Sequence, residues 1–116
     1  SDEASLNMDM VVLVNGNSAS ASEVLTAAIK DYKKGAIVGT TTYGKGIVQS
    51  IYNFSDGSGM SITTSQYFSP NGTAIHKIGI KPDYEIALSE EAERNIADLS
   101  YDEDTQLQKA VEILNK

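Results

Sequence analysis

Two side chains in the first half of the sequence could do chemistry together, the hydroxyl of Ser20 and the amine of Lys45. Ser20 lies in the stretch NSASASE, and Lys45 lies in the stretch GTTTYGKG. A serine beside a lysine is a known pairing of nucleophile and general base, a variant of the serine triad. The lysine acts as a base only when neutral, so its site must disfavour the ammonium ion by desolvation. The flanking Gly44 and Gly46 would let the backbone deliver that amine into a tight, dry pocket.

The GTTTYGKG stretch also comes close to a different motif, the phosphate-binding loop G-x-x-x-x-G-K-[ST]. The final position of that motif supplies a hydroxyl to Mg²⁺, and here it is Gly46. Such a loop must also be followed by a helix, whose N-terminus holds the anion. The stretch IVQSIYNF after Gly46 is instead typical of a strand. We therefore expect no nucleotide site here, and no cofactor is implied.

Both candidate residues are expected to follow buried strands. Residues 10–14 (MVVLV) and 36–39 (AIVG) are short apolar runs rich in β-branched residues. A helix is predicted to start at Ser20 and to stop at residues 33–35. Its predicted apolar face comprises Val24, Leu25, Ala28, Ile29 and Tyr32. Since the strands of a β-α-β unit are parallel, both end at the same edge of the sheet, so Ser20 and Lys45 should be near neighbours.

The remaining elements follow from the same patterns. Residues 47–54 and 60–68 read as two strands of a hairpin around SDGSG, and residues 84–88 read as a short edge strand. Helices are predicted over 89–96 and 104–114. The apolar face of the last helix is predicted to be Leu107, Ala110, Val111 and Leu114.

Each candidate also has a plainer interpretation. Ser20 and Glu23 have the S-x-x-E spacing of a capping box, so Ser20 could serve only to cap its helix. Ser18 is a weaker alternative nucleophile. His76 is the only histidine, and a loop or sheet-edge role is favoured over a Ser-His-Asp triad. As a nucleophile at a helix start, Ser20 would have unpaired N–H groups beside it that can bind a developing oxyanion.

Composition excludes several classes of function. The 116-residue chain carries a net charge of −7, which argues against nucleic acid as the main partner. It has no cysteine, so disulfides and thiolate chemistry are excluded, and the lone histidine has no partner at metal-ligand spacing. No apolar run approaches the roughly 20 residues that cross a bilayer. The size fits one domain with a modest core.

The stretch VVLVNGNSASASEVLTAAIKDYKKGAIVGTTTYGKGIVQ resembles the catalytic core of the C-terminal processing (tail-specific) serine proteases, peptidase family S41. The stretch DGSGMSITTSQYFSPNGTAIHKIGIKPDYEI and the closing DTQLQKAVEIL resemble the segments that follow in that family. The resemblance implies that Ser20 is the nucleophile, that Lys45 is the general base and that Gln49 orients Lys45. It also implies that the backbone N–H of Ala21 is an oxyanion donor.

The resemblance further implies a ClpP/crotonase-like α/β fold, truncated at its N-terminus. Residues 1–116 would be the C-terminal portion of an S41 catalytic domain, without the upstream PDZ domain and the glycine-rich turn that supplies the second oxyanion donor. The implied function is a serine endopeptidase that cuts proteins near their C-termini, and activity of the 116 residues alone is left open. The implied location of the parent protein is extracytoplasmic or membrane-associated.

Two rival functions stay open at this point. One is a non-catalytic ligand-binding module, since the S41 scaffold resembles that of retinoid-binding repeats. The other is an assembly module that forms a homo-oligomer, suggested by the acidic, amphipathic C-terminal helix. The presence of Ser20, Lys45 and Gln49 together speaks against a binding module, which has no need of all three.

Overall fold

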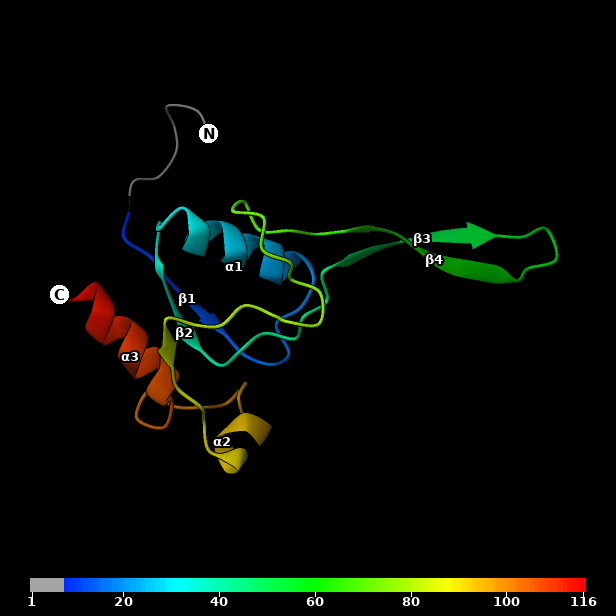
Figure 1. Ribbon diagram of the computed structural model, residues 1–116. Coiled ribbons are helices and arrows are strands. Elements are labelled where there is room, and N and C mark those ends of the chain that lie inside the picture. Colours follow the sequence, from blue (N-terminus) through cyan, green and yellow to red (C-terminus); the bar gives the residue numbers. More distant parts are fainter. Residues whose placement is uncertain (1–7) are drawn as a thin grey trace.

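The computed structural model describes residues 8–116 and shows a small α/β body from which a long hairpin projects (Figure 1). The body is built on a parallel sheet with the strand order β1-β2-β5. Its strands are β1 (Val11–Val14), β2 (Ala36–Gly39) and β5 (Tyr84–Glu85). The predicted β-α-β unit is confirmed, because α1 (Ala21–Asp31) connects the parallel pair β1 and β2.

Helices cover both faces of the sheet. Ile37 and Val38 are neighbours in β2 and therefore point to opposite faces, yet both are fully buried. The helix α1 packs against β2, while α3 (Thr105–Leu114) packs against β1 and β2 on the other face (Figure 1). The short helix α2 (Glu90–Arg94) lies between β5 and α3 in the chain, within the predicted range.

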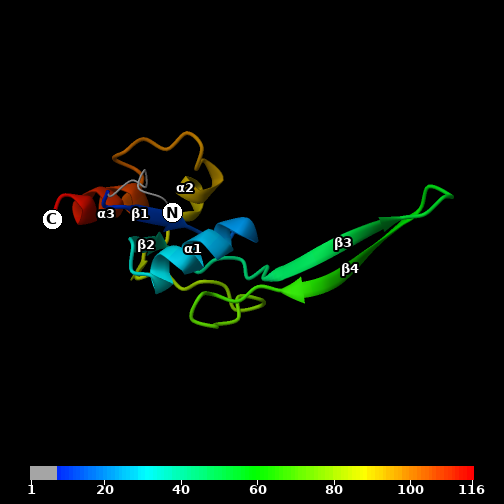
Figure 2. The same cartoon turned by 90° about the horizontal axis from the view of Figure 1, so that it is seen from above.

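The hairpin consists of β3 (Ile47–Asn53) and β4 (Gly59–Gln66), which pair antiparallel. Both views show it extending away from the helices and the parallel sheet (Figures 1 and 2). Every residue of β4 is exposed, and the apolar Tyr52, Met60 and Ile62 share one exposed face of the ribbon. The hairpin was predicted from two strand-like runs around the turn SDGSG, and it is confirmed.

The predicted apolar faces of two helices are confirmed only in part. In α1 the residues turned inward are Glu23, Thr26 and Ala27, while the predicted Leu25 and Tyr32 are 61% and 67% exposed. The rotation of α1 is set by polar contacts, because the side chain of Glu23 accepts hydrogen bonds from the loop after β2.

The same kind of correction applies to α3. Its buried residues are Gln106 and Ala110, whereas Leu107 and Leu114 are exposed. The side-chain amide of Gln106 donates a hydrogen bond to the Ile86 carbonyl oxygen at 2.8 Å. This polar contact faces the body where apolar contacts were predicted.

The close approach of β1 and β2 depends on Gly39, from which the loop that carries Lys45 departs. Gly39 has a φ of 131°, and a Cβ atom there would lie 1.8 Å from the Val14 carbonyl oxygen. Because Val14 and Gly39 are direct partners in the sheet, the backbones of β1 and β2 would have to move apart to relieve so short a contact.

We predict that Gly39→Ala lowers the free energy of unfolding by more than about 3 kcal/mol, the upper end of what overpacking costs. Gly57→Ala is the matched control, because Gly57 also has a positive φ (85°) but a Cβ there would meet nothing within 4 Å. It should cost only about 1–2 kcal/mol for its backbone conformation. Chemical denaturation measures both, and equal losses would show that the contact with Val14 is unimportant.

Candidate functional site

Ser20 occupies a strained turn between β1 and α1. Its backbone has φ 56° and ψ −116°, a combination that residues with a Cβ rarely adopt. Strain of this kind persists only where the surroundings hold it, and it often marks a functional residue. Upstream, Ser18 Oγ accepts a hydrogen bond from the Asn15 N–H at 3.1 Å, so the Ser18 hydroxyl stabilises the turn.

The N-terminus of α1 is capped by Ser20 and Glu23, which stand in the predicted capping-box arrangement. The Glu23 carboxylate accepts the Ser20 N–H at 3.0 Å, and the Glu23 N–H donates to the Ser20 carbonyl oxygen at 2.9 Å. At the starts of α2 and α3 the side chains of Ser89 and Asp104 accept N–H bonds directly.

Lys45 is brought to Ser20 by one carboxylate, that of Glu23. The Oε2 atom of Glu23 accepts the backbone N–H of Ser20 at 3.0 Å and that of Lys45 at 2.8 Å. Its Oε1 atom accepts the Thr42 hydroxyl at 2.5 Å and the Gly44 N–H at 2.6 Å. The backbones of the predicted nucleophile and base thus share a single acceptor atom, and their predicted proximity is confirmed.

Glu23 is fully buried, yet its ionised form is favoured. Burial by itself raises the pKa of its carboxyl, but the hydrogen bonds from Thr42, Gly44, Lys45 and Ser20 outweigh this and hold the pKa below its ordinary value. A lowered pKa means that the carboxylate contributes stability above its unfolded-state pKa and loses it as pH falls through the folded-state value. The four bonds are therefore intact at neutral pH.

The loop around Lys45 packs closely on residues 75–80. The Lys77 N–H donates to the Gly44 carbonyl oxygen at 2.9 Å, and the Ile80 N–H donates to the Thr42 hydroxyl at 2.7 Å. A Cβ atom at position 46 would lie 2.5 Å from the His76 nitrogen, which explains the glycine there. The Lys45 side chain is exposed, so the tight, dry pocket that was predicted for its amine is not formed by the residues that the structure describes. The strand β3, rather than a helix, follows Gly46, as predicted against a phosphate-binding loop.

Gln49 lies in β3 with its side chain exposed. The register of the hairpin shifts between Val48 and Gln49, because Val48 pairs with Ser65 and Gln49 with Thr63. Irregularities of this kind re-aim side chains and are common beside active sites. Within residues 8–116 no hydrogen bond joins the Lys45 and Gln49 side chains, so their predicted contact stays a prediction.

Ala21 is the first residue of α1, and its N–H lies beside Ser20. The first N–H groups of a helix have no intrahelical acceptor and carry the positive end of its dipole. In the part of the chain that the structure describes, the Ala21 N–H has no hydrogen-bond acceptor. It can therefore donate to a developing negative charge on a bound group.

His76 is half-buried beside the loop that carries Lys45. Among residues 8–116, its Nδ1 atom is the one buried side-chain polar atom without a hydrogen-bond partner. No carboxylate of the described chain is hydrogen-bonded to it, so it does not form the Ser-His-Asp arrangement that was weighed against Lys45. Within the same residues no cluster of three or more His, Asp or Glu side chains could hold a metal ion, and no helix has the length and apolarity to cross a bilayer.

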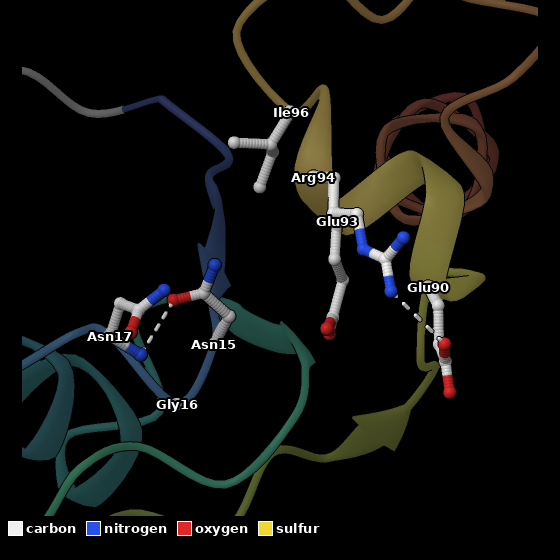
Figure 3. Close-up of a pocket in the computed structure, with 7 residues that line it drawn as sticks. All are labelled: Asn15, Gly16, Asn17, Glu90, Glu93, Arg94 and Ile96. Atoms are coloured by element: carbon white, nitrogen blue, oxygen red, sulfur yellow. Dashed lines mark hydrogen bonds and ion pairs between the residues drawn. The ribbon is translucent and has the colours of Figure 1, made fainter.

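A cleft lies at the carboxyl end of β1, between the turn that leads to Ser20 and the helix α2. Figure 3 shows Asn15 and Asn17 on one wall and Glu93 and Arg94 on the other. It is lined by Asn15, Gly16, Asn17, Glu90, Glu93, Arg94 and Ile96. None of the candidate catalytic residues lines this cleft, and its Arg94–Glu90 ion pair is largely exposed, so we assign it no chemistry.

The sequence argument missed the second role of Glu23 and the role of Thr42. The S-x-x-E spacing identified Glu23 as a capping partner of Ser20, which it is. Nothing in that spacing predicts that the same carboxylate reaches the loop 42–45. A polar residue on the buried side of a helix was the available signal, because a carboxylate is buried only with partners.

The comparisons with known proteins agree on one family. The sequence model of peptidase family S41 matches residues 1–86. The carboxyl-terminal-processing protease of Synechocystis sp. is 39% identical over 112 residues, which cover 97% of this chain and 26% of that protein. The chloroplastic C-terminal processing peptidase of Tetradesmus obliquus is 51% identical over 77 residues, covering 66% of this chain and 17% of that protein.

A solved structure, that of a photosystem II D1 C-terminal processing protease, is similar to this chain with a TM-score of 0.63 and 51% identity. The match covers 66% of this chain and 20% of that one. The predicted ClpP/crotonase-like α/β class is confirmed by this likeness, and both sheets are open. The chain spans about a quarter or less of the relatives that it matches.

The strain at Ser20 can be measured by comparing glycine with alanine at this position. We expect Ser20→Gly to be more stable than Ser20→Ala by about 1–2 kcal/mol, because glycine adopts a positive φ without a Cβ clash. At Ser22, an exposed position inside α1, the order should reverse by about 1 kcal/mol in favour of alanine. Denaturant titration of the four variants tests this, and the same order at both positions would contradict a strained Ser20.

Proposed function

The chain belongs to peptidase family S41, and from this premise we propose that Ser20 is the nucleophile and Lys45 the general base of a serine peptidase. The observation that carries the proposal is the single Glu23 oxygen that accepts the backbone N–H groups of both residues. The strained Ser20 turn supports it. A module that only binds or assembles has no need of that strain.

The proposed reaction is acyl transfer in two steps. The Ser20 Oγ attacks the scissile carbonyl carbon while its proton passes to the neutral amine of Lys45. The Ala21 N–H donates to the oxyanion that forms, and Lys45 then protonates the leaving amine as the C–N bond breaks. Water attacks the resulting ester with Lys45 again taking a proton, which releases the acid and restores Ser20. Gln49 is proposed to hold the Lys45 amine by a hydrogen bond.

The proposed substrates are proteins and peptides cut near their C-termini. The names of the Synechocystis and Tetradesmus relatives support this specificity. The chain spans only part of those relatives, so the specificity is proposed for the full-length protein, with residues 1–116 as the C-terminal portion of its catalytic domain. We also propose an extracytoplasmic location, in keeping with the family resemblance. No cofactor takes part in the proposed mechanism.

The base can be tested with Lys45→Arg in the full-length protein. Arginine keeps the positive charge but cannot lose its proton at working pH, so we expect the kcat for peptide cleavage to fall by at least about 100-fold. Lys34→Arg is the control, because Lys34 lies before β2, at the opposite edge of the sheet. It should retain wild-type activity.

An active Lys45→Arg enzyme would exclude Lys45 as the base. Full activity of Ser20→Ala would exclude Ser20 as the nucleophile and return the chain to the class of non-catalytic modules.

The role of Gln49 requires a separate test. If Gln49 holds the Lys45 amine, Gln49→Ala should lower kcat by about tenfold, the worth of one hydrogen bond, while leaving the fold intact. Asn53→Ala is the matched control, since Asn53 is another exposed amide of β3 and lies at the far end of that strand. Peptide cleavage and circular dichroism give the two readouts. Equal activity of the two variants would make Gln49 an ordinary strand residue.

A further inference from the structure

We propose that Glu23 is a positioning residue of the site, whose one carboxylate holds the Ser20 turn and the Lys45 loop in register with each other. This inference rests on the proposed function, since it concerns the placement of the nucleophile and the base. Glu23 is 0% exposed and therefore touches no substrate. Whatever it contributes to the reaction passes through the residues that it holds.

The geometry makes Glu23 the direct link between two segments that come from different strands. Ser20 follows β1, and Lys45 follows β2. Each is bonded through its backbone N–H to the same Oε2 atom, at 3.0 and 2.8 Å. One further bond joins the segments, from the Tyr43 N–H to the Ser18 carbonyl oxygen at 3.0 Å. A shift of the carboxylate would therefore move the nucleophile and the base relative to each other.

Only an ionised carboxylate satisfies this set of partners. All four groups around Glu23 donate, and a carboxylate accepts at both of its oxygens, whereas an amide presents one oxygen and one NH₂ group. In Glu23→Gln the NH₂ group must face either the pair Ser20 and Lys45 or the pair Thr42 and Gly44. In either orientation it opposes at least one backbone N–H. The isosteric amide must therefore displace one of the two segments.

A small displacement is enough to affect the rate. A misplacement of about 1 Å between reacting groups can cost about 100-fold in rate. Ser20 is also strained, and its N–H bond to Glu23 is one of the contacts that hold it in that conformation. The binding of substrate away from the reacting atoms does not depend on this register. The effect should therefore appear in kcat rather than in KM.

The test uses the full-length enzyme and a fluorogenic peptide that the wild type cleaves. We expect Glu23→Gln to lower kcat by about 100-fold, with KM unchanged to within about threefold. Glu103→Gln is the matched control. Glu103 has the same S-x-x-E spacing and accepts the Ser100 N–H at 3.1 Å, but it is exposed and, among residues 8–116, bonds to no other segment. It should keep wild-type kcat and KM.

A second pair of variants, which perturbs the buried carboxylate less, tests the inference if Glu23→Gln does not fold. Thr42→Val removes the hydroxyl that donates to Glu23 Oε1 and accepts the Ile80 N–H, and it leaves the other three bonds to Glu23 in place. We expect a fall in kcat of about tenfold, the worth of one hydrogen bond to a charged group, again with little change in KM. Thr26→Val is its control, because Thr26 is equally buried and its hydroxyl bonds only to the Ser22 carbonyl oxygen within α1.

The outcomes separate this inference from the proposed function. If Ser20→Ala keeps its activity, the proposed function fails, whatever Glu23 does. If Ser20→Ala is inactive but the folded Glu23→Gln enzyme keeps its kcat, Glu23 is only a helix cap and the inference is overturned. The inference is equally overturned if the loss lies wholly in KM. It is also overturned if Thr42→Val and Thr26→Val lose the same activity.

Discussion

The arrangement of this chain depends on a buried charge that must be satisfied. Burying a carboxylate is costly unless hydrogen-bond donors surround it, and Glu23 meets that demand with four donors drawn from α1 and from the loop after β2. The demand is mutual, because the Ser20, Gly44 and Lys45 N–H groups would otherwise lack acceptors. The carboxylate thereby sets both the rotation of α1 and the path of the loop. Thr42 extends the same network to Ile80, so the segment after the hairpin is tied in as well.

The network also accounts for the strain at Ser20. A residue with a Cβ keeps a positive φ only when other contacts over-determine it, and the bond from its N–H to Glu23 is one such contact. The same bond makes the carboxylate a capping group of α1. In α2 and α3 the N-cap side chains are used in the ordinary way. Of these three N-cap residues only Ser20 has a strained backbone, and strain that lowers stability at one residue often marks a functional position.

The hairpin is far less buried than the body of the protein. An isolated two-stranded ribbon is only marginally stable in water, and here β3 and β4 expose both faces, including Tyr52, Met60 and Ile62. Its base is nevertheless well connected, because the Tyr67 N–H donates to the Gly46 carbonyl oxygen at 2.7 Å. This bonded base of the hairpin adjoins the Lys45 loop, whereas the turn at its tip is exposed. Gln49 lies near the base, next to the shift in register.

The helices and strands of this protein and their order along the chain could be predicted from local sequence patterns, because such patterns reflect secondary structure. The β-branched runs predicted β1 and β2, the turn SDGSG predicted the hairpin, and the strand-like residues after Gly46 argued against a phosphate-binding loop. Parallel strands ending at one edge also placed Ser20 near Lys45 before any contact was known. The rotation of α1 and α3, and the Glu23 contacts that hold Ser20 near Lys45, depend on tertiary contacts and could not be predicted in this way. Periodicity predicted apolar faces with Leu25 and Leu107 inward, but the buried positions are taken by Glu23 and Gln106. The reason is that hydrogen bonds to distant backbone groups, absent from any local pattern, outweigh the burial of two leucines.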